Sequence, residues 1–225
     1  YTDFAVNNCT GGNCERRVSY LLSTTDLLID DLREMVASWA PGGVAKLDVT
    51  RAGKGGLSAI VTGMGSLSYG ELAGERMKLG LMLRDPEEEH DCFSDNSHNS
   101  HFYNAKGIRN VYMGHYKRVD GRVVNGPSLS SLVRAKSLNL DAEMMVKLDA
   151  TMSAMSQLVQ AAEDGEAYDQ MLAEGNTRGN ARVQAAIDTL IAQTKSIEKV
   201  VTALQLKTIV FEGSDSLDSP KAVFR

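Results

Sequence analysis

The fold class follows first from the stretch Glu15-Arg-Arg-Val-Ser-Tyr-Leu-Leu-Ser-Thr-Thr-Asp-Leu-Leu-Ile-Asp-Asp-Leu-Arg-Glu-Met-Val-Ala-Ser-Trp-Ala40. Its apolar stripe recurs at steps of three and four residues and consists of Leu21, Thr25, Leu28, Leu32, Met35 and Trp39. Charged residues fall largely between these positions, which is the pattern of a long amphipathic helix. The helix is expected to end at Pro41-Gly42-Gly43, because proline disfavours a helical residue before it and glycine releases the chain.

A second long stripe predicts another helix from about Thr177 to Leu204. Between the two, a methionine-rich helix is expected from Asp141 to Glu163, with Asp141 as its cap. The methionines at 144 to 155 are interpreted as core residues, because their spacing along an amphipathic helix needs no cofactor. We therefore predict an all-α fold, a bundle of antiparallel long helices joined by loops.

Glycines interrupt the helix expected from Leu57 to Leu83, at positions 63, 65, 70 and 74. Each interior glycine costs about 1 kcal/mol relative to alanine. Close packing of another backbone is the expected compensation, and Gly70 and Gly74 share a face.

The remaining chain is assigned more coarsely. Shorter helices are expected at 105–116, 128–136 and 167–173, and loops at 47–56 and 119–127. An irregular polar loop is expected around 89–104. The predicted organisation is a loop segment at 1–14, a helical-bundle domain at 15–210 and a tail at 211–225.

Composition limits the function classes. With 43% hydrophobic and 24% charged residues, the 225-residue chain can bury a core. Its net charge of -5 comes from interspersed acids and bases without a basic run, so no nucleic-acid partner is expected. No apolar run approaches the ~20 residues of a membrane helix, and no signal-peptide pattern stands at the start.

Three cysteines are present, and two of them are close together in Cys9-Thr-Gly-Gly-Asn-Cys14. The glycines let this loop turn back, which favours a disulfide, although a pair of free thiols stays open. Cys92 is the remaining cysteine, and a buried inert thiol is its default interpretation.

The most informative polar stretch is Glu88-Glu-His90-Asp-Cys-Phe-Ser-Asp95-Asn-Ser-His98-Asn-Ser-His101. Imidazole and carboxylate groups are costly to bury unless they pair or bind, and together they are common ligands of iron and zinc. A solvated histidine-bearing loop is an equally good interpretation, because the spacing matches no standard metal motif.

Glu71 and Glu75 lie four residues apart, which places them on one face of an α-helix. Like charges there need a basic partner, a metal ion or solvent. Arg76 would point away from Glu71 and Glu75, because it lies one position after Glu75 on an α-helix. We predict that two carboxylates and the histidine-rich loop converge as a metal site formed by Glu71, Glu75, His90, Asp95 and His98. Further binding contacts are assigned to Arg76, Asn96 and His101.

Several segments together resemble one protein family. They are Arg16-Arg17 through Tyr20-Leu-Leu, Thr25-Asp-Leu-Leu with Asp30-Asp31-Leu32, Trp39-Ala-Pro-Gly42, Thr62-Gly-Met-Gly-Ser-Leu-Ser, Gly70-Glu-Leu-Ala-Gly-Glu-Arg-Met77, Glu89-His-Asp-Cys-Phe-Ser-Asp-Asn-Ser-His98, Gly107-Ile-Arg-Asn-Val-Tyr-Met-Gly114 and Gly126-Pro-Ser-Leu-Ser-Ser-Leu132. They cover most of residues 15–205 and are similar to the C-terminal half of the iron-regulated branch of the imelysin peptidase family.

The resemblance implies two helical-bundle halves related by duplication and a place in the bacterial envelope, either periplasmic or anchored at the outer membrane. It also implies a role in iron uptake, with iron as the expected ligand and zinc or haem as alternatives. The family's Gly-Xaa-His-Xaa-Xaa-Glu motif is absent from this chain, which makes peptidase activity of the chain alone doubtful. In the family that motif lies in the first half, so the expected partner is an N-terminal half of the same protein, and an iron or haem carrier is a further one.

Two hypotheses follow from the resemblance. In the first, the chain belongs to an iron-linked binding protein whose polar residues face the missing motif. In the second, the missing half carries the metal ligands of a metallopeptidase, and this chain supplies carboxylates that orient them. The first is favoured, because nothing in this chain provides an open three-ligand zinc site with a general base. A purely structural hydrogen-bond network is the third possibility.

Overall fold

The structure is a computed structural model that describes residue 4, residues 8–207 and residues 209–224. The chain divides into two compact units, Tyr1–Gly56 and Leu57–Arg225.

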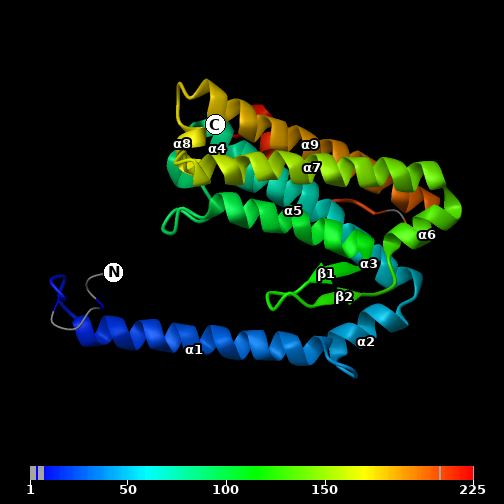
Figure 1. Ribbon diagram of the computed structural model, residues 1–225, viewed down its shortest axis with the longest axis horizontal. Helices are drawn as coiled ribbons and strands as arrows, with labels where there is room; N and C mark the ends of the chain where they lie inside the picture. Colours follow the sequence, from blue (N-terminus) through cyan, green and yellow to red (C-terminus); the bar gives the residue numbers. More distant parts are fainter. Residues whose placement is uncertain (1–3, 5–7, 208, 225) are drawn as a thin grey trace. The chain divides into compact units, whose positions relative to one another are not determined.

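The first unit contains the long helix α1 (Cys14–Trp39) and the short helix α2 (Val44–Arg51) (Figure 1). The prediction for α1 is confirmed, since Ala40 before Pro41 is extended and Gly42 has a positive φ of 87°. The expected loop at 47–56 is wrong except at residues 52 and 53, because residues 47–51 belong to α2 and residues 54–56 begin the helix α3 (Lys54–Ser66). Of the glycines that suggested a loop, Gly53 lies between the two helices, and Gly55 and Gly56 lie in the first turn of α3.

No residue of α1 is buried, although the helix carries many large apolar side chains. Several recur every seven residues along it: Leu21, Leu28 and Met35, and beside them Leu22, Ile29 and Val36. Such a broad apolar stripe is typical of a helix that packs in a bundle.

Cys9 and Cys14 form the disulfide that their spacing favours, with Cα atoms 6.0 Å apart. Gly12 in the intervening loop has a positive φ of 71°, a conformation that glycine adopts without strain. Cys92 is a half-buried free thiol.

The second unit is built around four long helical segments (Figure 1). One segment is continuous and comprises α3 (Lys54–Ser66), the π-helix η2 (Leu67–Lys78) and α4 (Leu79–Leu83). The others are α5 (Ser97–Met113), α7 (Leu138–Glu163) and α9 (Thr177–Ala203). In this bundle η2 contacts α5 and α9, and α7 also contacts both α5 and α9. Successive long segments run in opposite directions, so the all-α antiparallel bundle is confirmed.

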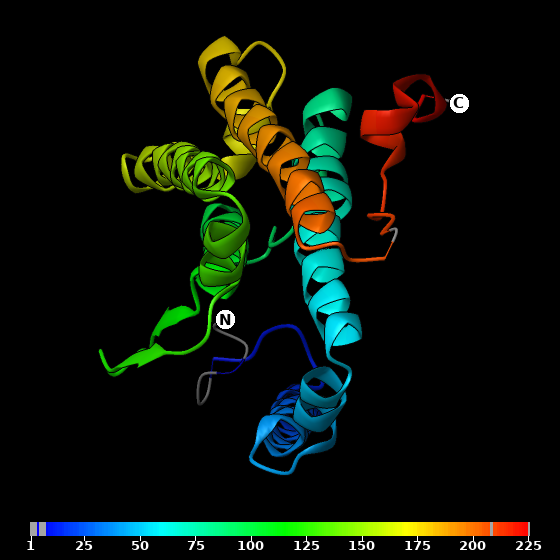
Figure 2. The ribbon, with the colours of Figure 1, turned by 90° about the vertical axis from the view of Figure 1, so that its right-hand side faces the viewer.

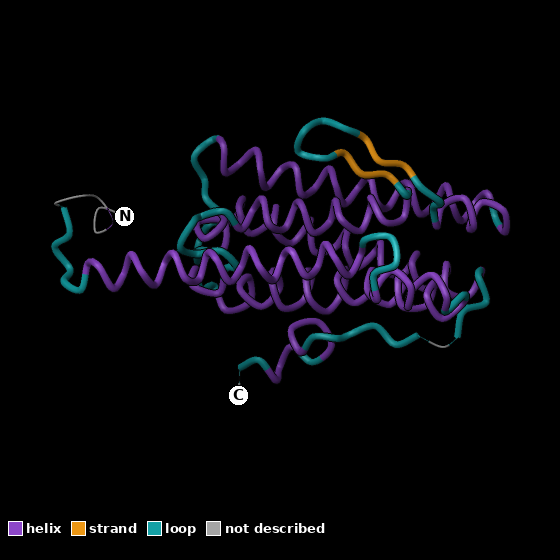
Figure 3. Tube along the Cα trace, turned by 90° about the horizontal axis from the view of Figure 1, so that it is seen from below, coloured by secondary structure: helices purple, strands orange, loops and turns teal. Residues whose placement is uncertain are grey.

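Shorter elements connect and cover the bundle. They are η3 (Pro86–Glu88), β1 (His115–Lys117), β2 (Val123–Asn125), α6 (Leu129–Lys136), α8 (Tyr168–Leu172), α10 (Asp215–Asp218) and η4 (Pro220–Ala222). The expected loop at 119–127 is in part a hairpin, in which β1 pairs antiparallel with β2 and Tyr116 lies opposite Val124 (Figure 3). The alternating pattern of each three-residue strand is too short to be recognised in the sequence.

The core of the bundle follows the predicted stripes. Val183, Ile187 and Leu190 of α9 are fully buried, as are Met144 and Met155 of α7, which confirms the methionines as core residues. The predicted cap of α7 is wrong, because the helix begins earlier.

Ser137 caps α7 instead, and its side chain accepts a hydrogen bond from the Leu140 amide. Asp141 is buried and accepts hydrogen bonds from Tyr112 Oη (3.0 Å), Ser130 Oγ (2.7 Å) and Arg134 Nε (2.9 Å).

The C-terminal segment packs along α3 and η2 as a strap, defined as residues 209–218, whose last four residues form the helix α10 (Figure 2). A Cβ added at Gly65 would overlap the Phe211 ring, and one added at Gly74 would overlap Ser214. At Gly70 it would overlap the backbone of the strap. The prediction that another backbone packs against these glycines is therefore confirmed at Gly70.

Candidate functional site

The histidine-rich run occupies the loop from η3 to α5 and the first turns of α5, so the irregular loop expected at 89–104 is wrong from Ser97 onward. The loop turns at Asp95, whose φ of 50° is positive. It is held to α5 by Asp91, whose amide donates to Ser97 Oγ at 2.9 Å and whose carboxylate accepts from Ser100 Oγ. The polar residues of the run are therefore fixed relative to the bundle.

His101 on α5 is fully buried and packs edge-on against Tyr168 of α8, with ring centroids 4.8 Å apart. The ring centroid of His90 lies 6.3 Å from that of His101. Burial, together with the charges of His90 and Arg76, lowers the pKa of His101 to about 3. His101 is thus a neutral imidazole at physiological pH.

Glu89 and His98 bring two further ionisable groups to the same place. Glu89 is buried, and burial raises its pKa, with Asp169, Asp95 and Asp91 adding to the shift and a hydrogen bond from Ser97 opposing it. Burial also lowers the pKa of His98. Both groups are therefore biased toward their neutral forms.

We call these residues the histidine cluster: Glu89, His90, His98, His101 and Tyr168. Among the described residues, most buried side-chain polar atoms without a hydrogen-bond partner belong to it, namely Glu89 Oε2, His98 Nδ1, both nitrogens of His101 and Tyr168 Oη. Leaving such an atom unpaired costs about 1–3 kcal/mol. The cluster therefore has unused hydrogen-bonding or ligating capacity.

The five residues predicted to hold a metal do not gather into one group. Within the described parts of the chain, no three His, Cys, Asp or Glu side chains are arranged to hold a metal ion. His90 and His98 belong to the cluster, but His90 is exposed, as are Asp95 and its neighbour Asn96. The Asn96 side chain accepts a hydrogen bond from Asn99 Nδ2.

The two glutamates of η2 have other partners. Glu71 Oε2 pairs with Arg76 Nη2 at 2.9 Å, and Glu75 accepts a hydrogen bond from Ser214 Oγ of the strap. The expectation that Arg76 points away from Glu71 is wrong because the segment is a π-helix. Its i→i+5 spacing brings residues five apart onto the same face.

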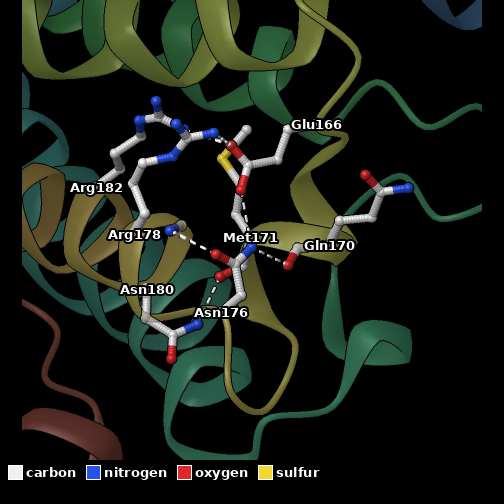
Figure 4. Close-up of polar contacts among 8 residues, drawn as sticks. Glu166, Gln170, Met171, Asn176, Arg178, Asn180 and Arg182 are labelled. Atoms are coloured by element: carbon white, nitrogen blue, oxygen red, sulfur yellow. Dashed lines mark hydrogen bonds and ion pairs between the residues drawn. The ribbon is translucent and has the colours of Figure 1, made fainter.

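Sequence reasoning missed Tyr168, which lies in a five-residue helix between two long ones. A network of polar side chains holds that helix against α9 (Figure 4). Glu166 pairs with Arg182 and, at 3.6 Å, with Arg178, and it accepts from Asn176 Nδ2 at 2.8 Å. Hydrogen bonds, the strongest from Asn176, keep the pKa of Glu166 below its usual value.

Two amides extend this network to the backbone of α8. Asn176 Nδ2 donates to the Gln170 carbonyl and Asn180 Nδ2 donates to the Met171 carbonyl, each at 2.7 Å. The network thereby fixes the helix that presents Tyr168 to His101. A lone tyrosine in a short helix has no distinctive sequence pattern, so only the fold reveals its role.

Comparison with known proteins gives the family. The family model described as imelysin matches residues 1–197 of the 225-residue chain. The chain belongs to the imelysin family. The match includes every residue of the histidine cluster in this imelysin chain, whereas the strap lies beyond it. No curated protein matches the chain.

None of the helices in the described part of this imelysin chain is both long enough and apolar enough to span a bilayer.

Proposed function

We propose that this imelysin chain acts in bacterial iron uptake at the cell envelope, as one part of a binding site for iron. Haem and zinc are the alternative ligands. The observation that carries the proposal is the histidine cluster, whose buried polar atoms lack partners within the described residues.

The chemistry of the cluster suits a borderline metal. Neutral imidazole is the form that binds metal ions, and burial favours this form for both His98 and His101. Imidazole, carboxylate and phenol oxygen are all known protein ligands of iron. The described residues alone do not present three such ligands in a suitable arrangement. We therefore propose an incomplete site that another polypeptide segment completes.

The proposed partner is an N-terminal half that carries the family's Gly-Xaa-His-Xaa-Xaa-Glu motif. The exposed apolar stripe of α1 supports a helical partner, because burying residues such as Leu28 and Met35 against another helix would remove them from water. An iron or haem carrier is a second proposed partner.

We propose a periplasmic or outer-membrane-anchored location. The disulfide between Cys9 and Cys14 supports it, because disulfides persist in oxidising compartments such as the periplasm.

The test is the metal content of the chain, alone and produced together with an N-terminal half. Intact-mass spectrometry would first establish which fragments purify together. We expect iron in the two-part preparation and its loss in a His98→Ala variant. His115→Ala is the matched control, because His115 lies in the hairpin and its Nδ1 is 2.8 Å from Asn125 Oδ1. Equal iron content in the two variants would contradict the proposal.

A metallopeptidase is the competing hypothesis, and the same preparation distinguishes it. Cleavage of a peptide substrate that is abolished by a chelator and restored by zinc would favour the peptidase. Iron binding without cleavage in this preparation is the outcome that the proposed function predicts.

A further inference from the structure

A groove lies between α9, η2 and the strap, at a place that shares no residue with the histidine cluster. Its volume is about 1050 Å³. The lining residues contributed by α9 run from Ile191 to Thr202, which corresponds to a length of about 17 Å. A groove of this size is large enough for a ligand of several hundred daltons.

The lining of the groove contains both apolar and polar side chains. The apolar part comprises Ile191 and Val201 of α9, Leu206 in the loop after that helix, and Ile209, Val210 and Phe211 of the strap. Tyr69 of η2 and Asp218 of the strap contribute polar groups, and the α9 residues Lys195 and Glu198 contribute opposite charges. A ligand that fits must therefore have an apolar body and at least one polar end.

The strap wall is firmly attached, so the groove is preformed. The Glu212 amide donates to Ser66 Oγ at 3.0 Å, and Ser216 Oγ donates to the Gly74 carbonyl at 3.0 Å. Between them, Ser214 Oγ bonds to Glu75. A wall fixed in this way limits the ordering that a ligand must impose, which favours affinity.

The charges in the groove favour a cation. The charged lining residues are two acids, Glu198 and Asp218, and one base, Lys195. The lining therefore carries one negative charge in excess. Asp218 accepts hydrogen bonds from Tyr69 Oη at 2.7 Å and from the Ser214 amide at 3.0 Å, so its carboxylate is held in place at the groove. The pKa of Tyr69 is raised to about 12 by burial, then by Asp218 and Glu198, which is consistent with a negative local field.

We propose that this groove binds a small cationic amphiphile, with its apolar body along α9 and a protonated amine or guanidinium facing Glu198 and Asp218. An anionic amphiphile of the same shape is disfavoured, because its charged end would meet the excess negative charge. The site is independent of the proposed iron function, since neither its residues nor its chemistry involve the histidine cluster.

The test uses three dansyl probes that share a fluorophore and a five-carbon chain and differ in their end group. Monodansylcadaverine ends in an amine, N-pentyl dansylamide is neutral and dansyl-aminohexanoic acid is anionic. Fluorescence titration of the chain is expected to rank affinity as cationic, then neutral, then anionic. An equal affinity for all three probes, or the reverse order, would overturn the proposal.

Variants locate the binding. Glu198→Gln should lower the affinity for the cationic probe by about two- to fivefold, as expected for an exposed charge, and leave the affinity for the neutral probe unchanged. Asp188→Asn is the matched control, because Asp188 is an exposed acid of the same helix outside the groove. Thr202→Trp should lower the affinity for every probe, since a large ring at this position would fill the groove. Unchanged binding in Thr202→Trp, or equal effects of the two acid variants, would place the probe elsewhere and refute the site.

Discussion

Replacement of Gly70 by alanine tests the packing of the strap against η2. A Cβ at this position would lie 2.8 Å from the Glu212 carbonyl carbon and 2.9 Å from the Gly213 carbonyl oxygen. Both are backbone atoms of a segment held by several hydrogen bonds, so they cannot move aside cheaply. Overpacking of this kind costs typically about 1–3 kcal/mol.

The same substitution also removes a flexible residue from a helix, which by itself stabilises by up to about 1 kcal/mol. Gly63→Ala isolates this gain, because a Cβ at Gly63 meets no atom within 4 Å. We expect Gly63→Ala to raise the free energy of unfolding by about 0.5–1 kcal/mol. Gly70→Ala should lower it by up to about 2 kcal/mol, after the two contributions are combined.

Urea unfolding followed by far-ultraviolet circular dichroism measures both variants against the unmodified chain. A change of 1 kcal/mol corresponds to about 2–4 °C in Tm for a protein of this size, so thermal unfolding gives a second measurement. If Gly70→Ala proves as stable as Gly63→Ala, the strap does not pack on this glycine in solution and the reasoning is refuted.

Two further predictions concern buried ionisable groups. His101 has a folded-state pKa of about 3 and an unfolded value near 6.5, so the unfolded chain takes up the proton first and stability falls with pH below about 6.5. Between pH 6.5 and 4.5 this loss of stability is up to about 2.7 kcal/mol in the metal-free chain. The urea midpoints measured at these two pH values should therefore differ less in His101→Gln than in the unmodified chain. An equal difference in both would count against a neutral buried His101. Asp141→Ala should lower the free energy of unfolding by about 3 kcal/mol, because it leaves Tyr112 Oη and the Arg134 guanidinium without their acceptor. Asp149→Ala, which breaks the exposed pair with Arg109, should cost less than about 1 kcal/mol in the same urea assay, and similar losses in both variants would contradict the buried network.

Periodicity was sufficient to predict the long helices, because burial of one face imposes the same spacing on any core-facing helix. The apolar stripe of α9 is an example. The end of α1 was predicted separately, from Pro41 and the glycines after it. Glycine spacing also predicted a backbone neighbour for Gly70, but it could not identify the strap, whose hydrogen bonds to η2 span more than a hundred residues of sequence.

The site was less predictable for two physical reasons. The pairing of Glu71 with Arg76 depends on π-helical geometry, and a reading based on α-helical periodicity assigns these residues to different faces. The role of Tyr168 depends on how the loop after α7 folds, which the network around Glu166 determines through contacts with α9. The histidine-rich run was correctly singled out as unusual, because buried imidazoles without partners are costly wherever they occur.

The π-helix also affects how this chain should be aligned with other sequences. Its 12 residues, Leu67–Lys78, follow i→i+5 spacing, so each turn holds more residues than a turn of α-helix does. In a relative that is α-helical here, an ungapped alignment would pair Gly70 and Gly74 with residues that point in other directions. The structurally correct alignment would place a gap inside a continuous helix, where insertions are not ordinarily expected. A one-residue deletion between Leu67 and Lys78 would accordingly change which side chains face the strap without shortening any loop.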